Sequence, residues 1–183
     1  MVELPAGSFV MGSVEGDPEA RSDEQPRRKI SISKPFSMSA YEITVGQFRE
    51  FVKATGYVTE AEASGEGGWK ASRASSYGEH NPDFNWANPG YSASDSYPVT
   101  MVTYADAMSF CNSEDAYRQE YSAFPSGPST GTMRVIRGGC FMDLNSFLRS
   151  SRRGFLEPRK ALNTQGFRVV EGELSLPASD LKT

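Results

Sequence analysis

The chain has 183 residues, of which 38% are hydrophobic and 23% are charged. This length and composition predict a globular protein with one hydrophobic core and argue against a disordered chain. The formal net charge of −4 gives no electrostatic basis for binding nucleic acid, and no run approaches the roughly 18 apolar residues of a membrane span.

The N-terminal part of the chain predicts short strands. Residues 3–13 predict a strand that turns at Ala6-Gly7, and residues 14–27 are acidic and turn-rich, which predicts a loop. Alternating apolar and polar residues then predict two further strands, Lys29–Ser33 and Phe36–Ile43.

A first helix is predicted to begin near Thr44. Thr44 and Gln47 have the spacing of a capping box, and Gly56 is a plausible C-terminal stop. Four apolar residues recur at helical spacing and should face the core: Val45, Phe48, Phe51 and Val52.

Residues 58–97 are rich in Gly, Ser, Asn and Pro, and we expect a long irregular segment. Aromatic residues within it should pack it down on the rest of the protein: Trp69, Trp86, Tyr91 and Tyr97.

Residues 98–121 predict a short strand and a second helix that begins near Thr103, where Asp106 completes another capping signal. Its apolar face would contain Ala107, Phe110 and Cys111.

The C-terminal part contains a turn-rich connection over residues 122–132, a strand over Thr132–Gly138 and a closing strand over Phe167–Val170. Two helices among many short strands predict the α+β class.

The chain has two cysteines and one histidine. Two cysteines do not make a disulfide framework at this size. Cys111 is expected to be a buried thiol in the second helix, and His80 an ordinary surface residue. These residues lack the spacing of a zinc or iron site, and a Ser-His-Asp triad is excluded unless His80 is its base.

Residues 134–170 contain the frame RVIRGG…LRSSRR…GFRVV. This frame resembles the C-terminal part of the formylglycine-generating-enzyme (sulfatase-modifying factor) family, and LPAGSFVMGS, YEITVGQFREFVKATGY and YPVTMVTYADAMSFCN resemble its earlier segments in the same order. The resemblance implies a variant C-type-lectin-like fold. We expect a single domain over residues 1–172, shortened in the middle, and a tail over residues 173–183.

The chain departs from this family in two ways. The family's oxidase binds copper(I) with two thiolates, but Asp143 and Leu148 stand about where these thiols would fall, and Cys140 replaces a usual serine. The central segment that supplies calcium ligands is also missing. We therefore expect no catalytic residues, no metal and no cofactor. A divergent oxidase that uses Cys140 is the rival hypothesis.

The family frame is expected to hold the loop structurally. Arg149 and Arg152 should bind backbone carbonyls with their guanidinium groups, rather than form a phosphate or carboxylate site. The frame residues are Arg137, Gly138, Gly139, Arg149, Arg152, Gly166, Phe167 and Arg168.

Between these frame residues, the side chains follow no helical or strand period, which favours a binding loop that displays them. The alternative for each phenylalanine is that it fills the core. This pattern resembles the variable proteins of diversity-generating retroelements, and the partner would be a protein or glycan bound through residues 140–165. The predicted ligand-binding residues are Cys140, Phe141, Asp143, Asn145, Phe147, Phe155 and Leu156.

Two further points stay open in the sequence. A sulfatase-modifying oxidase or an inactive paralogue of it is the alternative function. The compartment is unknown: residues 1–5 show no signal peptide, so the cytoplasm is the default, and surface display would fit a trimmed chain.

Overall fold

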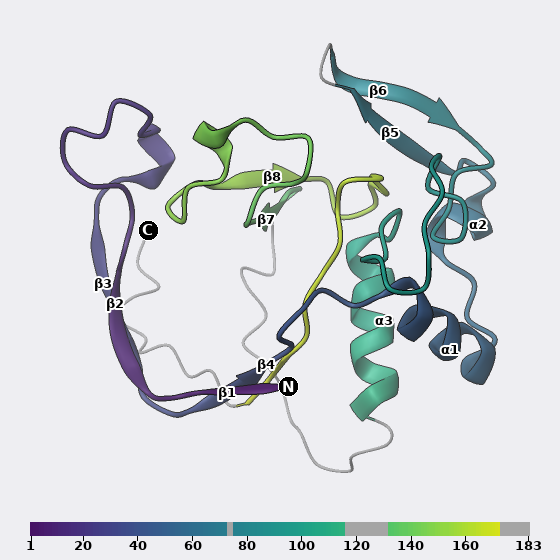
Figure 1. The fold of residues 1–183 in the computed structure, drawn as a ribbon, viewed down its shortest axis with the longest axis horizontal. Helices are drawn as coiled ribbons and strands as arrows, with labels where there is room; N and C mark the ends of the chain where they lie inside the picture. The colour runs from purple at the N-terminus through teal and green to yellow at the C-terminus, as the bar shows by residue number, and fades with distance from the viewer. Residues whose placement is uncertain (73–74, 116–131, 173–183) are drawn as a thin grey trace. The chain divides into compact units, whose positions relative to one another are not determined.

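The computed structural model describes residues 1–72, 75–115 and 132–172 (Figure 1). Contacts between residues divide the chain into two compact units. Unit 1 comprises Met1–Ala40, Ala123–Leu156 and Val170–Thr183, and unit 2 comprises Tyr41–Ser122 and Glu157–Val169. The predicted tail over residues 173–183 and most of the predicted 122–132 connection lie outside the described residues.

Unit 1 is built from short antiparallel strands. A three-stranded sheet has the order β1-β4-β9, and two separate pairs are β2-β3 and β7-β8. Its strands are β1 (Val2–Leu4), β2 (Gly7–Met11), β3 (Arg28–Ile32), β4 (Phe36–Met38), β7 (Arg134–Ile136), β8 (Gly154–Leu156) and β9 (Val170–Glu171). Two 3-10 helices, η1 (Ser22–Glu24) and η2 (Asn145–Phe147), complete it.

Three strand predictions were wrong in their extent. The strand predicted over Thr132–Gly138 is reduced to β7, and Gly138 already has a left-handed φ of 99°. The strand predicted over Phe36–Ile43 ends at Met38, because Ile43 is drawn into unit 2, where its N–H donates to the Phe167 carbonyl at 2.9 Å. The closing strand predicted over Phe167–Val170 is reduced to β9, since Phe167 instead packs its ring 5.5 Å from the ring of Phe110.

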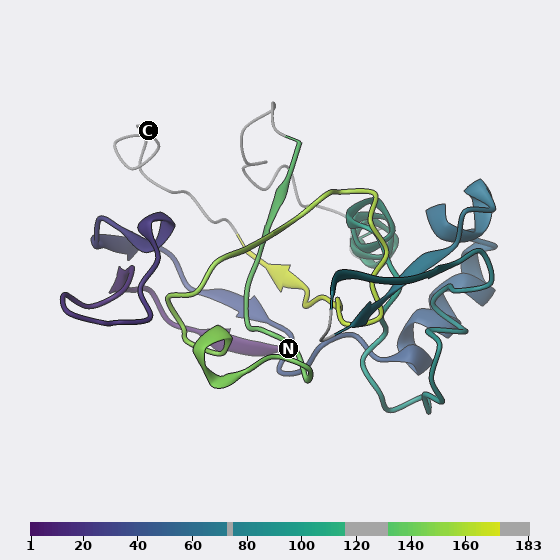
Figure 2. The same cartoon turned by 90° about the horizontal axis from the view of Figure 1, so that it is seen from above.

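Unit 2 contains the helices α1 (Val45–Thr55), α2 (Glu60–Ser64) and α3 (Tyr104–Asp115) and the hairpin β5 (Gly68–Ser72) and β6 (Ser75–Asn81). Figure 2 shows α3 along its axis. Both predicted helices are confirmed with their caps. At α1, Thr44 and Gln47 form the full capping box and Gly56 adopts a left-handed φ of 68°.

The long irregular segment predicted over residues 58–97 was wrong, because α2 and the β5-β6 hairpin lie within it. The hairpin is made largely of Gly, Ser and charged residues, so strand propensity gives no signal there. The short strand predicted before α3 is also absent, and Val99 and Met101 there make single backbone hydrogen bonds to Ile43 and Leu162.

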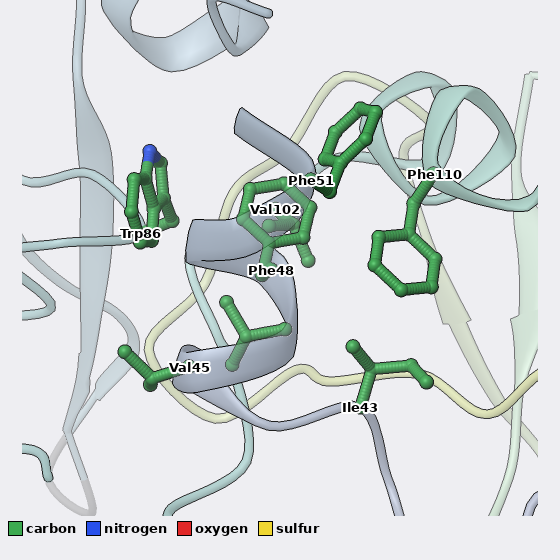
Figure 3. Packing of buried hydrophobic residues seen from close by; sticks show 8 residues of the cluster. Ile43, Val45, Phe48, Phe51, Trp86, Val102 and Phe110 are labelled. Carbon is green, nitrogen blue, oxygen red and sulfur yellow. The ribbon is translucent and has the colours of Figure 1, made fainter. Parts of the chain in front are cut away.

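The main core lies in unit 2. Phe48 is fully buried, and its ring lies 5.3 Å from that of Trp86 and 5.9 Å from that of Phe110 (Figure 3). The buried cluster consists of Ile43, Val45, Phe48, Phe51, Trp86, Val99, Val102 and Phe110. Burial of each such side chain contributes about 1.5–3 kcal/mol, which makes this cluster the main source of stability in unit 2.

The burial of the two cysteines and the single histidine was predicted with mixed success. Cys111 and Cys140 are both reduced and both partly exposed, so the prediction of a buried Cys111 was wrong. His80 is exposed, as predicted, with its ring 4.5 Å from that of Trp69.

Within the described ranges, no three His, Cys, Asp or Glu residues are placed to hold a metal ion. No helix among these residues is long and apolar enough to cross a membrane.

Candidate binding loop

The candidate site is the loop that follows β7. Gly138 and Gly139 open it with left-handed φ angles of 99° and 69°. The left-handed φ of Gly139 favours glycine at this position, and a Cβ atom there would also lie 2.6 Å from Cδ2, the tip of the Leu148 side chain.

A reciprocal turn then fixes Cys140 and Asp143. The Cys140 N–H donates to Asp143 Oδ2 at 2.8 Å, and the Asp143 N–H donates to the Cys140 carbonyl at 3.0 Å. The Asp143 carboxylate therefore closes the backbone turn at the start of the loop.

The middle of the loop presents large apolar side chains to solvent. Phe141 and Leu144 are 69% and 70% exposed, and Phe147 and Leu148 are 42% and 51% exposed. The sequence reasoning selected Phe141 and Phe147 but missed Leu144, whose exposure no periodic pattern signals. Asn145, another predicted site residue, is exposed at the start of η2.

Arg149 anchors the end of the loop to residues far away in the sequence. Its guanidinium group donates to both carboxylate oxygens of Glu24, at 2.8 and 2.9 Å, and to Asp17 Oδ2 at 2.8 Å. It also reaches the carbonyls of Glu19 and Ser146. Carboxylates as well as carbonyls thus bind this arginine, whereas the sequence reasoning expected carbonyls alone. The hydrogen bonds from Arg149 lower the pKa of Glu24, whose side chain is fully buried.

A second anchor is Arg137. Its Nη1 donates to three successive carbonyls, those of Ser150, Ser151 and Arg152, at 3.0–3.4 Å. Arg152 itself lies with its guanidinium carbon 4.7 Å from the ring centre of Phe147. Its buried Nη1 has no hydrogen-bond partner among the described residues, so the carbonyl contacts expected of Arg152 are made by Arg137 instead.

The β7-β8 pair separates two predicted site residues. Phe155 lies opposite Val135 and is 45% exposed. Leu156 lies opposite Arg134 and, because strand side chains alternate, points to the other face. The seven predicted ligand-binding residues therefore do not share one surface.

The C-terminal part of the predicted binding segment belongs to unit 2. Asn163 is buried, and its Oδ1 accepts a hydrogen bond from the Ala71 N–H at 2.8 Å. Lys160 Nζ lies 4.7 Å from the ring centre of Trp69. These contacts hold residues 160–163 against the β5-β6 hairpin. We therefore restrict the candidate binding site to residues 140–155, instead of the predicted 140–165.

The remaining frame residues, Gly166 to Arg168, also lie in unit 2. A Cβ atom at Gly166 would lie 2.7 Å from Glu42 Oε1 and 3.0 Å from the Val99 carbonyl oxygen. Phe167 packs against the main core, and Arg168 is exposed. Gly166 and Phe167 thus have packing contacts.

The donor atoms of the loop do not fit copper(I), the metal that the family resemblance implies. Copper(I) prefers soft thiolate ligands. The loop offers one thiol, Cys140, whose pKa is raised by burial and by the charge of Asp143. A raised pKa disfavours the thiolate that binds metal.

Comparisons with known proteins agree with the family resemblance. The family model described as the sulfatase-modifying factor enzyme 1-like domain matches residues 1–119 and 113–172. Mouse formylglycine-generating enzyme is 34% identical over 131 residues, which cover 61% of this chain and 34% of the mouse protein. The mouse protein named inactive C-alpha-formylglycine-generating enzyme 2 is 45% identical over 65 residues, which cover 36% of this chain and 20% of that protein. The match therefore spans about a third or less of each of these relatives.

One solved structure is similar over nearly the whole chain. PvdO from Pseudomonas aeruginosa superposes with a TM-score of 0.72 at 19% identity, covering 93% of both chains. At this identity the similarity concerns the fold alone, and it supports the mixed α+β architecture with few helices and many short strands.

Proposed function

This chain belongs to the sulfatase-modifying factor enzyme 1-like family, and we propose that it is a non-catalytic ligand-binding module of that family. The observation that carries the proposal is the turn at the start of the loop. The family resemblance implies that Asp143 and Leu148 stand about where the oxidases have thiols. The Asp143 carboxylate accepts a hydrogen bond from the Cys140 N–H, and Leu148 is an exposed apolar side chain.

The contacts around the loop support binding as its role. Arg149 and Arg137 hold the loop backbone through Glu24, Asp17 and successive carbonyls. Side chains such as Phe141 can then stay exposed without loss of the loop conformation. Aromatic side chains on a rigid backbone supply contact area at a low entropic cost, which favours binding.

A finer proposal is that the loop is of the variable type found in diversity-generating retroelements, with a protein or glycan as ligand. The observation that favours it is that the anchoring contacts of Arg149 and Arg137 involve no side chain between Phe141 and Leu148. A neighbouring reverse-transcriptase gene, together with a near-copy of the 3′ end of this gene that differs at adenines, would support this proposal. Neighbouring sulfatase genes would contradict it.

The alternative is a sulfatase-modifying protein, either an oxidase or an inactive paralogue. The chain is similar both to the mouse enzyme and to the mouse protein named as inactive, so this similarity does not choose between the two. Copper(I) titration of the full chain, with an assay on a cysteine-containing sulfatase peptide, separates the oxidase from the binding module. We expect neither stoichiometric copper binding nor turnover. Tight binding with turnover that is lost in Cys140→Ser would overturn the proposal.

The binding role is tested with a peptide display library and a glycan array probed with the full chain. Ligands selected on the parent should bind less tightly when Phe141, Asp143, Asn145, Phe147 and Phe155 are replaced together by serine. A milder variant, Phe141→Ser alone, guards against loss of folding. Unchanged binding in a folded five-residue variant would show that this loop is not the binding site.

A further inference from the structure

Arg152, near the end of the candidate loop, has a guanidinium group without an acceptor. Among the described residues, no carboxylate forms an ion pair with it and no carbonyl accepts a hydrogen bond from it. In that part of the chain, Nη1 is the only nitrogen of the side chain that is both buried and unpartnered, so the other N–H groups, which also lack partners, lie at the surface. Arg149 and Arg137 instead direct their guanidinium groups to carboxylates or carbonyls, as an arginine with a purely structural role does.

The position of Arg152 is nevertheless fixed from both sides. Its N–H donates to the Arg149 carbonyl at 3.1 Å, and its carbonyl accepts from Arg137 Nη1 at 3.1 Å. Its guanidinium carbon lies 4.7 Å from the ring centre of Phe147, whose own N–H donates to the Leu144 carbonyl at 2.9 Å. A side chain that is ordered before binding loses little conformational entropy when a ligand arrives.

The contact with Phe147 orients the guanidinium group and leaves its donors for a ligand. An aromatic ring attracts a cation through the charge distribution of its face and supplies no oxygen or nitrogen acceptor. A carboxylate, by contrast, accepts parallel hydrogen bonds from the edge of the guanidinium fork. The ring therefore positions the fork, and the missing acceptor is of the kind that a carboxylate supplies.

The neighbouring arginines favour a ligand group with a single negative charge. A phosphate group carries nearly two charges at neutral pH and is usually bound by a cluster of arginines. Here Arg149 is bound by carboxylates and Arg137 by carbonyls. Arg153 contacts the Met11 sulfur at 3.9 Å. Arg152 is thus left as one charged donor, which matches one carboxylate.

The side chains displayed beside Arg152 favour a protein ligand over a glycan. Leu144, Phe147 and Leu148 are all exposed in the same turn of the loop. Apolar side chains of this kind provide contact area for other apolar side chains. They offer no hydrogen bond to the hydroxyl groups that cover a sugar.

We propose that Arg152, held over Phe147, binds an aspartate or glutamate side chain of a protein ligand whose neighbouring apolar residues contact Leu144 and Leu148. The proposal rests on the proposed binding function and specifies the chemistry of its ligand. The carboxylate accepts from the guanidinium fork, and the apolar contacts exclude water around this pair.

The first test selects ligands from a random peptide display library with the full chain and with the variant Arg152→Glu. Peptides selected on the parent should carry an acidic residue beside leucine, isoleucine or phenylalanine. Peptides selected on Arg152→Glu should carry a basic residue instead, because reversing one charge of a contact reverses the preferred partner. A merely structural role of Arg152 would not produce this reversal.

A double-mutant cycle then uses one selected peptide and fluorescence anisotropy. Arg152→Gln should weaken binding about tenfold, and so should replacing the acid of the peptide by its amide, since each change removes a charged hydrogen bond. Both changes together should weaken binding no more than either alone. The matched control is Arg153→Gln, which removes the same charge one residue away and should change the affinity by less than about twofold.

Several results would overturn the proposal in protein variants that circular dichroism melting shows to be folded. They are additive effects in the cycle, equal weakening by Arg152→Gln and Arg153→Gln, and selected peptides without enrichment of acidic residues. An amide peptide that binds the parent as tightly as the acid peptide overturns it without any protein variant. A uronic-acid glycan that binds the parent on a glycan array and loses binding in Arg152→Gln, when no peptide is selected, would assign the carboxylate to a glycan and also overturn it.

The failure of this proposal is distinguishable from that of the proposed function. If Phe141→Ser weakens the selected ligands while Arg152→Gln leaves them unchanged, the loop binds its ligand without Arg152, and this proposal alone fails. If the five-residue loop variant and Arg152→Gln are both folded and both leave binding unchanged, the loop is not the binding site and both proposals fail.

Discussion

Asp106 offers the sharpest test of how unit 2 is held together. Its fully buried carboxylate accepts three hydrogen bonds: from the Tyr57 hydroxyl at 2.9 Å, the Glu60 N–H at 3.0 Å and the Thr103 N–H at 2.8 Å. It therefore joins the start of α3 to the start of α2 and to the chain that follows α1.

In Asp106→Ala, all three donors lose their acceptor. Each buried donor that is left unsatisfied costs about 1–3 kcal/mol, and a water that enters the vacated space can restore part of the loss. We expect the free energy of unfolding to fall by about 3–5 kcal/mol. Asp106→Asn keeps the shape and one acceptor oxygen but turns an amide toward the Thr103 N–H, so a loss of about 1.5–3 kcal/mol is expected.

Urea unfolding followed by circular dichroism measures these changes through linear extrapolation. The control is Asp95→Ala, because Asp95 is an exposed carboxylate whose ion pair with Arg49 lies at the surface. Such pairs contribute about 0–1 kcal/mol. The reasoning is refuted if Asp106→Ala is no less stable than Asp95→Ala, since three buried hydrogen bonds would then have no measurable effect.

Two further predictions concern unit 1. Because hydrogen bonds from Arg149 hold the pKa of Glu24 below its ordinary value of 4.5, the resulting stabilisation is complete above that value and is lost as the pH falls through the lowered pKa. Urea midpoints measured down to acid pH should therefore fall less steeply in Glu24→Gln than in the parent, and parallel curves would contradict this reasoning. Burial raises the pKa of Cys140, so in a Cys111→Ser background its alkylation by iodoacetamide should require a higher pH than that of an unstructured cysteine peptide. A pH midpoint at or below that of the peptide would contradict the described surroundings.

The parts of the fold that could be predicted from the sequence are those with local causes. The capping box at Thr44 and Gln47, and the pair Thr103 and Asp106, use side chains three residues apart to satisfy helix N-termini, so the sequence alone contains the whole interaction. The apolar spacing of α1 likewise predicted that Phe48 would be buried.

The parts that could not be predicted depend on distant partners. Glu24 lies in an acidic stretch that indicates a solvated loop, yet its side chain is fully buried by Arg149, 125 residues away. The same capping signal that placed Asp106 could not show that Tyr57 also donates to it. A local pattern cannot encode a contact whose second partner is remote in the sequence.

The candidate site was hardest to predict because its residues follow no period. Without periodicity, the alternation that separates exposed Phe155 from the more covered Leu156 becomes visible only when the β7-β8 register is known. Leu144 is 70% exposed, although leucine is usually a core residue, and nothing in the sequence indicated that its side chain faces solvent. Only the loop frame was recognisable, and it was recognised through its resemblance to a known family rather than through a periodic pattern.

That division between frame and displayed side chains has a physical origin in the anchors themselves. Arg149 and Arg137 bind Glu24, Asp17 and backbone carbonyls, and none of these contacts involves a side chain between Phe141 and Leu148. Backbone carbonyls are present whatever side chain a residue carries. Substitutions at exposed positions therefore leave the anchors unchanged, so the recognition properties of the loop can change while the energy that holds it in place is retained.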